Sequence, residues 1–273
     1  MHDHKISNHK LVSIILVTCN GLELTKACLS SLWQYTPQPF ELIIVDNGSS
    51  DGTQAYIKSL ETVMGVFNDE NKGFAAACNQ GLRAANGDTI VLLNNDTFVT
   101  KEWLSNLVKW LRRDPTIGIV GPRSNRILPK QRIYHMPYKS AEDIHLFADR
   151  WRDQHHSQGY EVEQLSGMCM VFRRSLLTEV GGFDEQFYPG NFEDDDLSLR
   201  TLIADYRLWV ADDVYIHHYG GQSFANLPWH YNQVYKDNRT RFFQKWNLRR
   251  PMSYWKLAEQ EKPFDPMKHR IDI

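Results

Sequence analysis

The chain has 273 residues, of which 42% are hydrophobic and 23% are charged, and its formal net charge is −2. This composition is typical of a globular protein and excludes a strongly basic nucleic-acid-binding protein, so we expect no nucleic-acid partner. The longest apolar stretch, "LVSIILV", is far shorter than the roughly 20 residues that cross a bilayer. The four cysteines show no metal-ligand spacing such as C-x-x-C and are interpreted as reduced core residues of a cytoplasmic protein.

Apolar runs typical of buried strands alternate with segments of helical periodicity in the first half of the chain. The expected strands lie at 11–20, 40–46, 62–69, 88–97 and 117–122. The expected helices lie at 21–36, at 73–87 and at 101–114, with another beginning near Thr53. The helix at 73–87 is expected to end at Gly87. This alternation predicts an α/β fold with a mostly parallel sheet and helices on both faces.

The second half of the chain is less regular. The expected elements are a helix at 141–154 capped by Ser140, a strand at 161–174, a helix at 196–206, a strand at 207–224 and a helix at 232–246. The first ten residues are polar and are expected to be flexible. We therefore predict a flexible N-terminus at 1–10, one catalytic domain at 11–225 and a helical, aromatic and basic extension at 226–273.

Polar residues directly follow three of the apolar runs. They read "TCN" at 18–20, "DNG" at 46–48 and "NND" at 94–96. Because ligands bind at the carboxyl ends of strands in open α/β sheets, these segments are candidate ligand contacts. For Asp96, a helix N-cap and a metal ligand that holds a diphosphate both remain open. Asp46 could belong to a simple turn or contact a nucleotide.

Two further segments carry chemistry. Residues 193–196 are four adjacent acids before an apolar pair. Acids in a first helical turn complement the helix dipole, but four of them suggest that some face a metal, a proton or a hydroxyl. Adjacent strand residues point to opposite faces, so only one of His217 and His218 should face a site. A strand-end histidine is more often structural than a ligand.

In this order, the motifs resemble those of family-2 glycosyltransferases of the GT-A fold. The resemblance covers roughly residues 11–224. The chain is similar above all to bacterial members of this family that are often described as rhamnosyltransferase-like. The motifs that carry it are "TCN", "VDNGSSDGT", "NKGFAAACNQG", "LLNNDT", "GGFDEQF…FEDDDLSLR" and "HHYGGQS".

The resemblance implies a role for individual residues on the donor side. The implied contacts to the nucleotide come from Thr18 and Asn20 near the base, Asp46 at the uracil or ribose, and Gly73, Phe74 and Asn79 along the nucleotide. Asn94, Asn95 and Asp96 occupy the D-x-D position of the family, with Asn94 in place of the first aspartate. This departure implies a weaker metal site, or a first position that acts only by hydrogen bonding.

The resemblance also implies the reacting groups. Asp96 and His218 would be ligands of Mn²⁺ or Mg²⁺, Asp194 the general base, and Glu193 a group that holds acceptor hydroxyls. Asp195 and Asp196 are interpreted as the first turn of a helix, with Arg200 as an ion-pair partner.

The implied function is an inverting, metal-dependent glycosyltransferase of bacterial glycan or glycoconjugate synthesis. It would move a sugar from a UDP- or dTDP-sugar donor to a hydroxyl of a glycan, a lipid-linked or a protein acceptor. A catalytically silent glycan- or nucleotide-binding module and a sugar-nucleotide pyrophosphorylase are the alternatives. The extension at 226–273 is expected to pack on the domain and border the acceptor cleft; a homodimer contact, a neighbouring-domain contact and a peripheral contact with the inner face of the membrane stay open.

Overall fold

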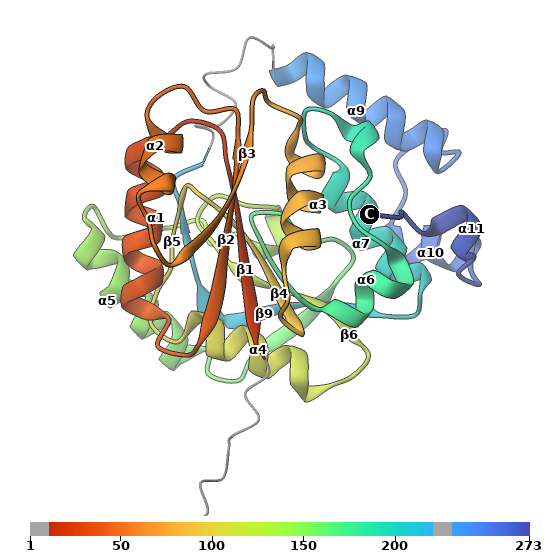
Figure 1. The fold of residues 1–273 in the computed structure, drawn as a ribbon. Coiled ribbons are helices and arrows are strands. Elements are labelled where there is room, and N and C mark those ends of the chain that lie inside the picture. The colour runs from red at the N-terminus through yellow and green to blue at the C-terminus, as the bar shows by residue number, and fades with distance from the viewer. Residues whose placement is uncertain (1–10, 221–230) are drawn as a thin grey trace, which may run out of the picture.

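A large mixed sheet forms the centre of the molecule. The computed structural model describes residues 11–220 and 231–273, and Figure 1 shows the sheet between two sets of helices. The strands are β1 (Val12–Thr18), β2 (Phe40–Asn47), β3 (Val63–Asn68), β4 (Thr89–Asn94), β5 (Thr97–Phe98), β6 (Ile117–Arg123), β7 (Gly159–Val162), β8 (Cys169–Arg173), β9 (Arg207–Tyr215) and β10 (His217–His218). Among the described residues, eight strands form one sheet in the order β3-β2-β1-β4-β8-β6-β9-β7, and β5 pairs with β10.

Helices cover both faces of this sheet. They are α1 (Leu22–Tyr35), α2 (Thr53–Lys58), α3 (Phe74–Ala84), α4 (Trp103–Arg113), α5 (Ala141–Gln154), α6 (Arg174–Val180), α7 (Glu193–Ile203), α9 (Tyr231–Lys245), α10 (Tyr254–Glu261) and α11 (Pro266–His269), with short 3₁₀ turns at Pro129–Gln131 and Glu185–Phe187. Alternate residues of β1 serve the two faces, because Ile15 packs with α3 and Ile14 with α1. The expectation of an α/β fold with a mostly parallel sheet is confirmed.

The expectation of one strand at 161–174 was wrong. Two strands lie there, and they occupy distant places in the sheet: β7 pairs with β9, whereas β8 runs antiparallel between β4 and β6. The turn between them is held by α7, since the backbone N–H of Leu165 donates to Ser198 Oγ and that of Gly167 to Asp194 Oδ2. Side-chain partners from α7 thus replace the ladder partners that a continuous strand would need.

Two other expectations need correction. Helix α3 ends at Ala84, and Gly87 is not its stop signal. A Cβ atom at Gly87 would lie only 2.6 Å from Ser13 Oγ, so close packing against β1 requires this glycine. The strand expected at 207–224 is divided into β9 and β10. Its last residues, and the expected domain boundary at 225/226, lie outside the described residues.

The C-terminal helices share the main hydrophobic core. Phe242, Trp246 and Leu257 are buried in the same cluster as residues of α3 and α7, and Figure 1 shows α10 and α11 beside α6 and α7, with α9 above them. The buried Asn238 side chain donates to the carbonyls of Phe187 and Gly190 at 2.9 and 2.8 Å. Helix α9 therefore holds the loop that leads into α7.

A buried ion pair inside α7 joins it to the extension. Arg200 Nε lies 2.8 Å from Asp196 Oδ2, and both side chains are fully buried. Asp196 also accepts from Trp246 Nε1 at 3.0 Å and lies 2.7 Å from Lys245 Nζ. Asp196 thus has the structural place that the sequence suggested, with Arg200 as its partner.

We expect Arg200→Met to lower the free energy of unfolding by about 3–5 kcal/mol, because it removes one of the two cations that pair with the buried Asp196 carboxylate and leaves the carbonyls of Val180 and Gly182 without their donor. Urea denaturation followed by circular dichroism measures this change. Arg207→Met is the matched control, since Arg207 pairs with Asp114 and Glu161 at a half-exposed position and should cost less than about 1 kcal/mol. Equal losses for both variants would contradict the prediction.

The described helices are all too short or too polar to span a bilayer.

Candidate functional site

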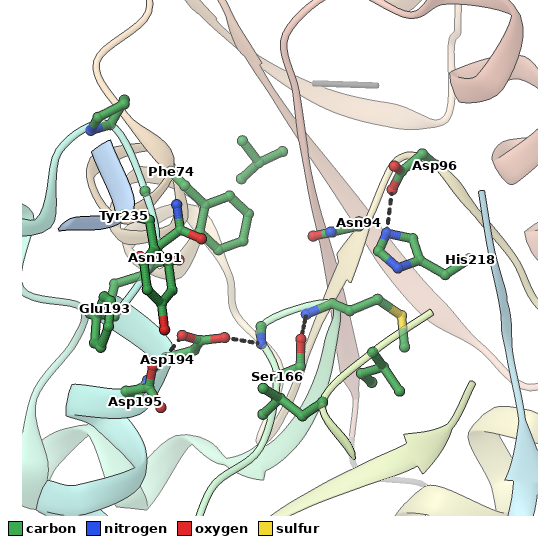
Figure 2. Close-up of a pocket in the computed structure, with 18 of the residues that line it drawn as sticks. Phe74, Asn94, Asp96, Ser166, Asn191, Glu193, Asp194, Asp195, His218 and Tyr235 are labelled. Carbon is green, nitrogen blue, oxygen red and sulfur yellow. Dashed lines mark hydrogen bonds and ion pairs between the residues drawn. The ribbon is translucent and has the colours of Figure 1, made fainter. Parts of the chain in front are cut away.

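A cavity of about 610 Å³ opens at the carboxyl ends of the parallel strands. Val17 of β1, Asn47 of β2 and Asn94 of β4 contribute to its lining. Figure 2 shows two groups of polar side chains that face this cavity from opposite sides. Acidic residues at the start of α7 form one group, and Asp96 with His218 forms the other.

The acidic group begins at an unusual stretch of backbone. Asn191 and Phe192 both have a φ of 76°, a conformation that non-glycine residues rarely adopt. Such strain persists only where surrounding contacts hold it, and it is concentrated at functional sites. Here it places Glu193, Asp194 and Asp195 together at the cavity, directly at the N-terminus of α7.

Asp194 is the best oriented of these carboxylates. Its Oδ2 accepts from the backbone N–H of Gly167 at 2.8 Å, and its Oδ1 accepts from the N–H of Asp195 at 3.0 Å. Burial raises the pKa of Asp194, and these backbone donors oppose part of that rise. Burial and the charge of Asp194 raise the pKa of Glu193 well above its usual range. The arrangement favours a fixed Asp194 carboxylate with increased basicity.

Asp195 provides a pH test of this acidic group. Its Oδ1 accepts from Gln164 at 3.1 Å and from Tyr254 at 3.0 Å. Burial and then the charge of Asp194 raise the pKa of Asp195 from 3.8 to about 8. A raised folded-state pKa stabilises the fold below pH ~4, and this stabilisation is lost as the pH rises through ~8.

We therefore expect the melting temperature of Asp195→Asn, relative to wild type, to rise between pH 5 and pH 8. Asparagine keeps the shape of the side chain but cannot titrate, so only wild type loses the bound proton in this window. Thermal unfolding at a series of pH values measures the difference. A difference that stays constant over the window would contradict the raised pKa.

The pairing of two short strands brings the other group together. Thr97 of β5 pairs with His218 of β10, and the N–H of Tyr219 donates to the Asp96 carbonyl at 2.9 Å. His218 Nε2 consequently lies 3.0 Å from Asp96 Oδ1. Burial lowers the pKa of His218, but the hydrogen bond and charge of Asp96 outweigh it and leave the pKa raised.

A loop after β6 fixes the orientation of the His218 ring. The side chain of Asn125 holds the backbone of His218: its Oδ1 accepts from the backbone N–H of His218 at 2.8 Å, and its Nδ2 donates to the His218 carbonyl at 3.1 Å. The carbonyl of Arg126 lies 2.7 Å from His218 Nδ1, so Nδ1 carries the proton. Nε2 is then directed at Asp96, with its lone pair free for a cation whenever the ring is neutral.

This donor set fits a divalent cation. A carboxylate and an oriented imidazole are ligands of Mn²⁺ and related ions. Among residues 11–220 and 231–273, no group of three or more His, Cys, Asp or Glu side chains is placed to hold a metal. The protein would thus supply part of a coordination shell, as in sites where substrate phosphates complete it.

His217 points elsewhere. Its Nδ1 lies 2.7 Å from Tyr138 Oη, and burial lowers its pKa to about 4. The two adjacent histidines therefore have different surroundings, and only His218 lines the cavity.

Only some of the residues predicted for the site line the cavity. Those that do are Phe74, Asn94, Asn95, Asp96, Glu193, Asp194 and His218. The side chains of Thr18, Asp46 and Asn79 are buried. Thr18 accepts from Asn95 Nδ2 at 3.0 Å, and Asn79 donates to the Phe183 carbonyl at 2.9 Å, so both support neighbouring residues.

Of the remaining predicted contacts, Asn20 and Gly73 lie just before α1 and α3, and Asp46 lies near the end of β2. Asn20 accepts from the N–H of Ser50 at 2.8 Å. Gly73 has a φ of 86°, and a Cβ there would lie 2.8 Å from the Tyr188 ring. Asp46 Oδ1 accepts from the N–H of Ser49, whereas its buried Oδ2 has no partner among the described residues. The nucleotide contacts assigned to these residues stay predictions.

Sequence reasoning missed several residues that line the cavity. They are Asn47, Asn71, Arg126, Gln164, Asn191, Tyr231, Tyr235 and Tyr254, among others. The spacing of Tyr231 and Tyr235 by four positions was a usable signal, since it places both on one face of a helix. No local pattern marked Arg126 or Gln164, because tertiary packing of loops brings them to the cavity.

Solved structures define the class of fold. The chain is similar to a mannosyltransferase from Pyrobaculum calidifontis in complex with GDP-Man and Mn²⁺, with a TM-score of 0.62 and 20% identity over 93% of this chain and 69% of that one. It is also similar to S. aureus TarS 1–349 in complex with UDP-GlcNAc, with a TM-score of 0.61 and 16% identity over 92% of this chain and 71% of that one. The fold is that of GT-A glycosyltransferases.

The sequence comparison gives the family. Residues 13–181 match the model of glycosyl transferase family 2, and the chain belongs to that family. It is 27% identical to the pre-mycofactocin glycosyltransferase of Mycobacterium tuberculosis (strain ATCC 25618 / H37Rv), over 74% of this chain and 41% of that protein. It is 28% identical to the poly-beta-1,6-N-acetyl-D-glucosamine synthase of Staphylococcus aureus (strain COL), over 72% of this chain and 47% of that protein. The chain spans less than half the length of these two relatives.

Proposed function

We propose that this chain transfers a sugar, with inversion, from a nucleoside-diphosphate donor to an acceptor hydroxyl. The observation that supports this most directly is one cavity with two opposed polar groups. Asp194, oriented by Gly167, lies in one, and the Asp96–His218 pair lies in the other. A proton acceptor and a cation-binding pair are the two parts that such a transfer needs.

In the proposed step, the acceptor oxygen attacks the anomeric carbon while the bond from that carbon to the donor phosphate oxygen breaks. Asp194 takes the hydroxyl proton, and the electron pair of the broken bond leaves with the nucleoside diphosphate. The raised pKa of Asp194 makes it a stronger base than an exposed aspartate. Attack from the face opposite the leaving group inverts the anomeric configuration.

Asp96 and His218 would hold Mn²⁺ or Mg²⁺ in this proposal. The ion would neutralise charge on the departing diphosphate. Arg126 adds a fixed positive charge to the lining and packs over Gly220, where a Cβ would lie 2.4 Å from its Cδ. Positive charge on this side would compensate the negative charge of the donor diphosphate in a cavity that is rich in carboxyl groups.

The structural neighbours named above hold GDP-Man with Mn²⁺ or UDP-GlcNAc, which supports a nucleotide sugar as the donor here. The synthase of S. aureus supports a role in polysaccharide synthesis. We propose a UDP- or dTDP-sugar as the donor and a role in bacterial glycan assembly.

Thermal unfolding with nucleotides tests the donor. The melting temperature is measured with UDP, dTDP, GDP and their common sugar forms, each with and without Mn²⁺ or Mg²⁺. We expect UDP or dTDP compounds to raise it in the presence of metal, because a ligand of the native state stabilises that state. If no nucleotide raises it with either metal, the proposed donor class is wrong.

A further inference from the structure

Tyrosines of the C-terminal helices form one wall of the cavity. Tyr231 and Tyr235 of α9 and Tyr254 of α10 all line it. Tyr231 and Tyr235 stand four positions apart, on one face of the helix. Tyr235 is 44% exposed, so substantial surface of this side chain is accessible. Figure 2 shows Tyr235 on the same side as Asp194 and Asp195, away from Asp96 and His218.

Two unpaired polar atoms lie beside this wall. Asn191 Nδ2 and Glu193 Oε2 are buried and have no hydrogen-bond partner among the described residues. Both residues line the cavity, and Glu193 is only 6% exposed. Tyr231 Oη donates to Asn191 Oδ1 at 3.3 Å, which leaves the amide NH₂ available to the cavity. Unpaired buried polar groups are uncommon and call for an explanation.

A hydroxyl can pair with both atoms. Asn191 Nδ2 can only donate, whereas Glu193 Oε2 accepts when the carboxyl is ionised and can donate when it carries the proton, and a hydroxyl both donates and accepts. Neighbouring hydroxyls on one ring would satisfy both atoms. Aromatic rings carry negative charge on their faces, which suits the weakly positive C–H face of a pyranose ring. The accessible ring of Tyr235, together with the unpaired polar atoms of Asn191 and Glu193, is thus suited to a carbohydrate.

We propose that Tyr235, with Asn191 and Glu193, forms an acceptor subsite for a pyranose ring, so that the acceptor is a carbohydrate. This inference rests on the proposed transfer and specifies its acceptor class. This side argues against a phosphate at the subsite, because Glu193, Asp194 and Asp195 offer carboxyl groups there and no described Lys or Arg side chain lines it. Arg126, the cationic side chain among the described lining residues, lies on the opposite side, where its guanidinium donates to the carbonyls of Tyr219 and Gly220.

Tyr235 also has a packing role, which the choice of variants must separate from binding. Its ring lies 5.1 Å from the Phe192 ring, centroid to centroid. Tyr235→Phe keeps both this contact and the open ring face. Tyr235→Ala removes them. Trp255→Ala is the matched control, because Trp255 on α10 is 45% exposed and does not line the cavity.

Saturation-transfer NMR measures the subsite directly. The probes are the methyl pyranosides of glucose, galactose, mannose, rhamnose and N-acetylglucosamine, with UDP or dTDP and Mn²⁺ present. We expect saturation of ring protons for at least one glycoside in wild type. Its affinity should be about tenfold weaker in Tyr235→Ala, and it should be retained in Tyr235→Phe and Trp255→Ala. Circular dichroism of each variant verifies that it is folded.

Two results would overturn the inference. One is no saturation of any glycoside in wild type, and the other is equal saturation in wild type and folded Tyr235→Ala. Geranylgeranyl phosphate is tested in parallel, and a Tyr235-dependent signal from it alone would favour a lipid acceptor instead. Nucleotide binding in the same samples separates the two proposals. If UDP or dTDP binds and the glycosides do not, only the acceptor subsite is wrong; if neither nucleotide binds, the proposed transfer fails as well.

Discussion

Asp194→Asn is expected to lower kcat for sugar transfer by about 10²–10⁴-fold while nucleotide affinity changes little. Asparagine can still accept the N–H of Gly167, so the geometry of the cavity should be retained. It cannot take the acceptor proton, and an interaction made only in the transition state appears in kcat. Steady-state kinetics with a reactive donor–acceptor pair, together with calorimetry of the nucleoside diphosphate, measures both quantities.

Glu193→Gln is the matched control, since it changes the neighbouring acid in the same turn of α7. If Glu193 holds acceptor hydroxyls, this variant should mainly raise the KM for acceptor. A similar kcat for Asp194→Asn and wild type would show that Asp194 is not the base. A collapse of kcat in Glu193→Gln alone would move the base to Glu193.

Asp96→Ala is expected to weaken the metal-dependent binding of UDP or dTDP by at least about tenfold. The reason is that Asp96 supplies the carboxylate of the Asp96–His218 pair, 3.0 Å from the imidazole. Calorimetry with Mn²⁺ and with EDTA separates the metal-dependent part of the affinity. Unchanged affinity and unchanged metal dependence would assign Asp96 to a purely structural role in the turn between β4 and β5, since Glu102, and not Asp96, is the N-cap of α4.

The two histidines provide a control within one strand. His218→Ala should reduce the metal-dependent part of nucleotide affinity, because its Nε2 faces Asp96. His217→Ala should leave it nearly unchanged, because His217 Nδ1 contacts Tyr138. If His217→Ala reduces the metal-dependent affinity and His218→Ala does not, His217 is the metal ligand instead of His218.

Much of the fold could be predicted because local patterns agree with it. The apolar run of β1 is buried on both faces of the sheet, and the helical period in α1 and α4 matches their buried sides. The prediction of one strand at 161–174 was wrong for a physical reason. Residues 161–174 are apolar enough for one strand, but the backbone N–H groups of Leu165 and Gly167 in the middle of this segment donate to side chains of α7. Such partners are invisible to periodicity.

The acids and the histidine pair were recognisable because their residue types are costly in these positions unless they have a task or a partner. The separation of His217 from His218 followed from strand alternation and agrees with their contacts. In contrast, Arg126 and the tyrosines of α9 reach the cavity only through the packing of loops and of the extension. The local sequence around these residues therefore does not indicate that they line the cavity.

The most direct test of the account is cleavage of the donor. Release of nucleoside diphosphate is measured for UDP- and dTDP-sugars, with the methyl pyranosides as acceptors, in Mn²⁺ and in EDTA. The account predicts metal-dependent release from at least one donor by wild type and almost none by Asp194→Asn. Metal-dependent binding of nucleotides without cleavage of any donor would contradict it and would favour a silent nucleotide-binding module of the same fold.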